Sequence, residues 1–157
     1  MLLLSHEKTT HTESVFYGRI RIPYKRLVIM HLREELMIYK FGAKKASSIK
    51  DFDTFTTGVY GTVEYISFQR HEVHGHEDEE GVYVEFNDQL HGGEDVVEKV
   101  ILTKDTLLIS LSAPLFQLDD ATGFEVALDI TDEEFGVLSK GLEFVFWDNL
   151  ERLEINA

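Results

Sequence analysis

The sequence predicts an α+β fold: a mainly antiparallel β-sheet of about seven or eight strands, with one amphipathic helix near the C-terminus packed on it. Three observations support this prediction. Residues 82–87 and 124–130 alternate apolar with polar side chains, which is typical of half-buried strands. Thr131 and Glu134 have the spacing of a capping box, directly before apolar residues at helical intervals. Short runs rich in β-branched and aromatic residues fill much of the remaining chain.

In the first half of the chain, four segments have the composition of strands: residues 15–22, 27–32, 36–41 and 59–70. The first of these ends at Pro23. The second and third are separated by Arg33-Glu34-Glu35, and they form either a tight hairpin or one short helix. Residues 43–51 are polar and rich in lysine, so they are predicted to be a loop or a short exposed helix.

The second half gives clearer patterns. After the strand at 82–87, Gly92-Gly93 predicts a turn or a bulge. Residues 97–103 and 106–112 are two strands joined through Lys104-Asp105 as a hairpin. The final strand, at 124–130, leads directly into the helix. That helix has three acidic residues in its first turn and an apolar stripe of Phe135, Leu138, Leu142, Val145 and Phe146.

Length and composition place the chain among ordinary globular proteins. Its 157 residues predict a single domain over 1–157, with residues 1–12 as a frayed N-terminal tail. The absence of cysteine excludes a disulfide scaffold, a thiolate zinc site, an iron–sulfur cluster and a cysteine nucleophile. No apolar run approaches the roughly 20 residues that span a bilayer, and residues 1–4 are too short for a signal-peptide core. We therefore expect a cytoplasmic protein that does not bind membranes.

The charge is strongly acidic and unevenly distributed. The formal net charge is −14, made up of +6 over residues 1–50 and −20 over residues 51–157. Such a surface is repelled by phosphate backbones, so nucleic-acid binding is disfavoured, and it attracts basic proteins. The acidity is equally consistent with a role in solubility alone. Attraction between the basic and acidic parts of two copies, giving a homodimer, is a further alternative.

Residues 71–80 form a stretch rich in histidine and acidic residues. Imidazole and carboxylate groups bind zinc, nickel or copper, so a metal-binding protein using His71, His74 and His76 is an alternative function. The stretch is more typical of a solvated hairpin loop, and we assign no metal ligands and no cofactor. The sequence has no G-x-S-x-G elbow, P-loop, G-x-G-x-x-G after a strand, or H-E-x-x-H motif. We therefore name no catalytic residues and expect no enzymatic activity, the alternative being a small enzyme with an unrecognised site.

A polar segment follows the strand at 82–87. Asn87, Asp88 and Gln89 come after Glu85 and precede the glycine pair. Asn and Asp side chains commonly close turns by bonding nearby backbone groups. The same side chains could instead offer hydrogen-bond donors and acceptors to a partner.

The order of these patterns resembles that of the immunity protein 10 family of bacterial polymorphic toxin systems. The resemblance covers roughly residues 80–147 and rests on Y-V-E-F-N-D-Q from Tyr83, V-I-L-T-K-D-T-L-L-I-S-L from Val100 and F-E-V-A-L-D-I-T-D-E-E-F from Phe124. It implies a non-catalytic cytoplasmic inhibitor that binds and occludes a cognate toxin. The acidic charge predicts that this toxin is basic, as nucleases commonly are. The residues expected to bind the partner are Glu77, Asp78, Glu79, Glu80, Glu85, Asn87, Asp88 and Gln89.

Overall fold

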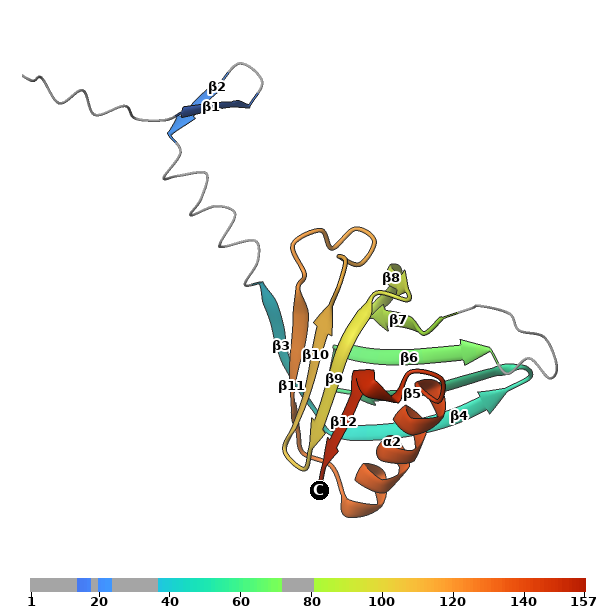
Figure 1. Ribbon diagram of the computed structural model, residues 1–157. Helices are drawn as coiled ribbons and strands as arrows, with labels where there is room; N and C mark the ends of the chain where they lie inside the picture. Colours follow the sequence, from blue (N-terminus) through green and yellow to red (C-terminus); the bar gives the residue numbers. More distant parts are fainter. Residues whose placement is uncertain (1–13, 18–19, 24–36, 72–80) are drawn as a thin grey trace, which may run out of the picture. The chain divides into compact units, whose positions relative to one another are not determined.

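The computed structural model describes residues 14–17, 20–23, 37–71 and 81–157, in two compact units, Met1–Leu36 and Met37–Ala157. In the first unit, β1 (Ser14–Tyr17) and β2 (Ile20–Pro23) form a two-stranded antiparallel sheet with Val15 opposite Ile22 (Figure 1). The prediction of one strand over residues 15–22 is therefore wrong, because two short strands pair with each other there. The expected N-terminal tail and the strand at 27–32 lie outside the described residues.

The described part of the second unit contains two five-stranded sheets. Sheet I has the strand order β12-β9-β10-β11-β3, with these bounds: β3 (Ile38–Ala43), β9 (Val97–Thr103), β10 (Thr106–Leu111), β11 (Gly123–Leu128) and β12 (Leu153–Asn156). The predicted β9–β10 hairpin and the predicted strand at β11 are confirmed. The two outer strands, β3 and β12, each pair parallel with their neighbours.

Sheet II is antiparallel throughout and has the order β4-β5-β6-β7-β8, with these bounds: β4 (Lys45–Asp51), β5 (Thr54–Tyr60), β6 (Tyr65–His71), β7 (Tyr83–Phe86) and β8 (Asp88–Glu94). The α+β class and the mainly antiparallel pairing are confirmed. The single sheet of seven or eight strands is wrong, because residues 37–71 and 81–157 hold ten strands in two sheets. Gly92-Gly93 lies within β8, next to a register shift between Glu85 and Phe86 in the β7–β8 pairing.

Helix α2 (Asp132–Val145) packs against β4 and β5 of sheet II (Figure 1). The capping box is confirmed: the Glu134 backbone N–H donates to Thr131 Oγ1 at 3.2 Å, and the Thr131 N–H donates to Glu134 Oε2 at 2.9 Å. The hydrogen bond from the Thr131 backbone is the main reason that the pKa of Glu134 lies below its ordinary value. Among the described residues, no helix is long and apolar enough to cross a membrane.

The close packing of α2 explains why a polar segment forms β4. Gly141 on the helix faces Ser48 of β4 and Thr57 of β5, whose hydroxyl groups lie 2.8 Å apart. A β-carbon on Gly141 would lie 2.5 Å from Ser48 Oγ. Only small side chains therefore fit on β4 and β5 directly beneath this part of the helix. The loop or exposed helix predicted for residues 43–51 is wrong, because small polar residues suit a strand beneath a closely packed helix.

The hydrophobic core lies between the inner faces of the two sheets and helix α2. Phe86 of sheet II contacts Phe124 of sheet I with ring centroids 4.8 Å apart, and Phe68 contacts Phe146, directly after α2, at 5.9 Å. The predicted apolar stripe is confirmed at Leu138, Leu142, Val145 and Phe146, which are all buried. Sheet II therefore uses one face for the core, and its other face is available for function.

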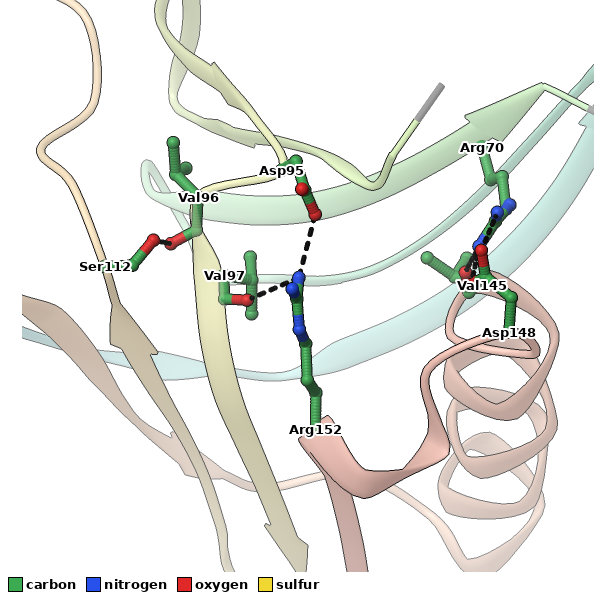
Figure 2. A network of polar contacts seen from close by, with 8 residues as sticks. All are labelled: Arg70, Asp95, Val96, Val97, Ser112, Val145, Asp148 and Arg152. Atoms are coloured by element: carbon green, nitrogen blue, oxygen red, sulfur yellow. Dashed lines mark hydrogen bonds and ion pairs between the residues drawn. The ribbon is translucent and has the colours of Figure 1, made fainter. Parts of the chain in front are cut away.

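Two arginines hold the C-terminal segment against the sheets (Figure 2). Arg70 of β6 donates to the Val145 carbonyl at 2.9 Å and makes a two-pronged ion pair with Asp148, at 2.5 and 2.7 Å. Arg152 lies in the short 3₁₀-helix η1 (Leu150–Arg152) and donates to Asp95 at 2.8 Å. These contacts fix the end of α2 and the chain that follows it.

Replacing Thr131 by alanine is expected to lower the free energy of unfolding by about 1 kcal/mol, because the substitution removes the N-cap oxygen that accepts from Glu134. Urea denaturation measures this change. Thr62→Ala, at an exposed position in the β5–β6 turn, is the control and should leave stability nearly unchanged. Equal midpoints for the two variants would contradict a stabilising role for the cap.

Candidate functional site

The outer face of sheet II is polar and aromatic. Strand alternation and the pairing register place six side chains of β5, β6 and β7 on this face: Tyr60, Tyr65, Ser67, Gln69, Tyr83 and Glu85. Tyr60 and Tyr65 are direct cross-strand neighbours, and their rings stack with centroids 5.9 Å apart. A sheet face of this composition can form both hydrogen bonds and flat apolar contacts.

A buried carboxylate lies at the centre of this face. Glu85 is only 7% exposed, and its side chain accepts a short hydrogen bond from the Tyr65 hydroxyl. On the other side, Tyr83 lies across Gly92 so closely that a β-carbon there would overlap the Tyr83 hydroxyl. The glycine that was predicted to make a turn or a bulge therefore makes room for a tyrosine ring.

The two tyrosines act as hydrogen-bond donors here. Burial, followed by the hydrogen bond to Glu85, raises the pKa of Tyr65 well above its ordinary value. Burial, followed by the charge of Glu85, raises the pKa of Tyr83. A phenol with a raised pKa keeps its proton at neutral pH, so neither residue is suited to act as a general base. The group therefore presents hydroxyl donors beside a carboxylate.

A hollow of about 280 Å³ opens at the end of the same sheet, between β5, β6, β7 and β8. The residues that line it are Thr54, Gln69, Arg70, His71, Gly81, Tyr83 and Glu94. Thr54 Oγ1 and His71 Nδ1 lie 3.1 Å apart, within hydrogen-bond distance. This volume is slightly below the range of about 300–1,000 Å³ that is typical of small-molecule sites. The hollow is therefore large enough for a single inserted side chain.

The predicted partner-binding residues separate into three groups. Glu85 lies on the outer face, as described above. Asn87 has a φ of 60°, and its Oδ1 accepts from the Tyr65 backbone N–H at 2.8 Å. Asp88 Oδ1 accepts from the Leu90 N–H at 2.9 Å. Both side chains therefore bond backbone groups, although Asn87, Asp88 and Gln89 are all exposed. The third group, residues 77–80, lies outside the described part of the chain.

The structure describes only the start of the histidine-rich stretch at residues 71–80. His71 is the last residue of β6 and lines the hollow, whereas His74 and His76 lie outside the described residues. Within residues 37–71 and 81–157, no group of three or more His, Asp or Glu side chains is arranged to hold a metal ion. The described part of the stretch thus contributes a lining residue to the hollow.

Sequence reasoning missed Tyr65, Gln69, Tyr83 and Glu94 as members of the site. The alternation of polar and apolar residues within β6 contained the signal, but composition alone predicts a single strand over residues 59–70. That prediction is wrong, because these residues belong to β5 and β6, with a turn in which the Gly61 N–H donates to the Glu64 carbonyl at 2.7 Å. The pairing of β6 with β7 then places Tyr65, Ser67 and Gln69 on the same face as Glu85.

The fold and site define a two-sheet α+β protein with a carboxylate-bearing, tyrosine-rich sheet face. Comparison of the chain with protein-family models, curated proteins and solved structures finds no match. The resemblance to the immunity protein 10 family therefore remains a prediction.

Proposed function

We propose that this chain is a non-catalytic protein-binding module that neutralises a basic partner, in the way that an immunity protein blocks its cognate toxin. The observation that carries the proposal is the outer face of sheet II. There, Glu85 and Glu94 place negative charge beside tyrosine hydroxyl groups and a hollow with room for one side chain. This arrangement suits a lysine or an arginine of a partner, since a guanidinium group forms charge-assisted hydrogen bonds with carboxylates and stacks on aromatic rings.

The overall charge supports the same proposal. The net charge of −14 produces a field that draws a basic protein toward this surface and raises its association rate. Acidic residues outnumber basic ones 25 to 5 over residues 51–157, which include most of sheet II. In this mechanism the negative charge of the chain attracts the basic partner over long range. The hollow then binds one cationic side chain of the partner, and sheet II occludes the partner's active surface. The association rate should then fall steeply as salt is added.

The proposal is tested by co-expressing the chain with the product of each neighbouring gene. We expect one neighbour to arrest growth alone, and this chain to restore growth and to co-purify with it. Rescue without binding, or the absence of any toxic neighbour, would contradict the proposal.

Exchanging Glu94 for lysine is expected to weaken binding of that neighbour by about 10- to 100-fold, because the hollow loses the carboxylate that faces a cationic side chain. Glu98→Lys is the matched control: it changes the net charge equally, but at an exposed position of sheet I. Surface plasmon resonance separates the effect of net charge on association from the effect of losing the Glu94 carboxylate on dissociation. Both variants should slow association, whereas Glu94→Lys alone should speed dissociation. Equal dissociation rates would remove the hollow from the interface.

A further inference from the structure

A second surface of the molecule shares only Arg70 with the residues that line the hollow. It is an aromatic cluster made by Phe55 of β5, Phe144 of α2 and Trp147, which follows the helix. The Phe55 and Phe144 rings have centroids 4.4 Å apart, and the guanidinium carbon of Arg70 lies 5.1 Å from the centroid of the Trp147 ring. Phe55 and Arg70 are direct cross-strand neighbours on the inner face of sheet II, so the four side chains form a continuous group. Trp147 is nevertheless 64% exposed.

Phe52 is a further exposed aromatic residue, at the tip of the β4–β5 hairpin and three residues before Phe55. It is 91% exposed and has a φ of 50°, in a two-residue turn between the paired residues Asp51 and Thr54. Glycine, asparagine and aspartate are the usual residues at such positions, because a bulky side chain is strained at positive φ. Neither burial of the side chain nor the requirements of the turn explain why position 52 is a phenylalanine. An exposed aromatic residue kept at the expense of backbone strain indicates a functional role.

The charges around these aromatic residues define the kind of partner. Asp51 and Asp53 flank Phe52 and Glu143 precedes Phe144, and all three are exposed. Asp148, which follows Trp147, is paired with Arg70, and the exposed Lys50 lies opposite Phe55. Exposed aromatic side chains with an acidic border suit a segment in which basic and apolar residues alternate, because arginine stacks on aromatic rings and pairs with carboxylates. A second copy of this chain, with its net charge of −14, would bring like charges together.

We infer that Phe52, Phe144 and Trp147, with the acidic residues beside them, form a docking surface for a basic and apolar segment of a partner protein. The inference rests on the proposed function only in that the partner is basic. It adds a contact surface centred away from the hollow. Its exposed aromatic side chains would be buried on binding, and buried aromatic anchors dominate the energetics of most protein interfaces.

Trp147 is the only tryptophan in the chain, so its fluorescence reports directly on this surface. The probe is a short peptide repeating Arg-Leu-Ser, with a peptide repeating Glu-Leu-Ser as its control. We expect the arginine peptide to shift the Trp147 emission to shorter wavelength in a saturable manner, and the glutamate peptide to have no effect. An unsaturable response, or an equal response to both peptides, would overturn the inference. So would a shift that depends only on protein concentration, because it would assign the surface to self-association.

Phe52→Asn supplies a variant that separates binding from folding. Asparagine tolerates positive φ, so this variant should melt at the same temperature as the unmodified chain or higher, yet bind the arginine peptide about tenfold more weakly. Phe116→Asn is the matched control, since Phe116 is 64% exposed but lies in the loop after β10, and its affinity should be unchanged. Equal losses in the two variants would show non-specific attraction and overturn the inference. Because the peptide assay needs no toxin, its outcome is independent of the growth assay above.

Discussion

Replacing Arg70 by methionine is expected to lower the free energy of unfolding by about 2–3 kcal/mol, a larger effect than the loss of an exposed ion pair. Methionine keeps most of the apolar stem but removes every donor. The Val145 carbonyl then loses its partner at the end of α2, and Asp148 loses both prongs of its ion pair. Arg70 is 8% exposed, so water cannot easily replace it. The expected loss is below that of a fully buried pair because the Asp148 side chain is 44% exposed and can be rehydrated.

Arg152→Met is the matched control for this prediction. Arg152 also links the C-terminal segment to the rest of the fold, through an ion pair with Asp95 in the β8–β9 connection. The Arg152 side chain is 30% exposed, however, and that of Asp95 is 60% exposed. An exposed pair contributes about 1 kcal/mol or less. Guanidinium denaturation of the two variants should therefore give clearly different midpoints. Similar midpoints would mean that the burial of Arg70 contributes little.

The Arg70–Asp148 pair also predicts how stability depends on pH. The hydrogen bond from Arg70 is the main reason that the pKa of Asp148 lies below its ordinary value of 3.8. A carboxyl group whose pKa is lowered by folding contributes stability that is fully present above its unfolded pKa and is lost as the pH falls through the folded value. The melting temperature of the unmodified chain should therefore fall more steeply below about pH 4 than that of Asp148→Asn. Parallel curves would contradict this assignment.

The parts of the fold that the sequence predicted are those whose signal is local. The β9–β10 hairpin, strand β11 and the Thr131 capping box each depend on residues within a few positions of one another. The division into two sheets depends on parallel pairing of β3 with β11 and of β12 with β9, across long separations in the chain. No local periodicity encodes such pairings, so the sequence alone favoured a single sheet.

The candidate site shows the same limit at the level of side chains. The sequence places Glu85 in the candidate site because it lies beside the Asn87–Gln89 segment. Its hydrogen-bond partner Tyr65 lies one strand away, and that contact depends on the antiparallel pairing of β6 with β7. Strand β4 was missed for a different reason. Its small polar residues have low strand propensity, and only the nearby helix makes them suitable.

The same close contact between helix and sheet gives the second large prediction. Gly141→Ala is expected to lower the free energy of unfolding by about 2 kcal/mol, although alanine is intrinsically the better helix former by about 1 kcal/mol. The added methyl group would lie 2.7 Å from the β-carbon of Thr57, which is fully buried and branched and so cannot rotate away. The helix must then shift away from β4 and β5, and the core beneath it loses contacts. Steric overlap should outweigh helix propensity at this position.

Gly136 provides the matched control on the same helix. Nothing lies within 4 Å of a β-carbon placed there, so Gly136→Ala should raise the free energy of unfolding by about 1 kcal/mol. One substitution made at two positions of one helix should thus have opposite signs in thermal denaturation. Adding Thr57→Ala to Gly141→Ala should recover part of the loss, since it removes the overlapping Thr57 hydroxyl group, and a double-mutant cycle measures that coupling. If both glycine variants stabilise the chain, then helix α2 does not pack closely on sheet II at Gly141. The distance between the helix and the Ser48 and Thr57 side chains would then have to be larger than in this structure.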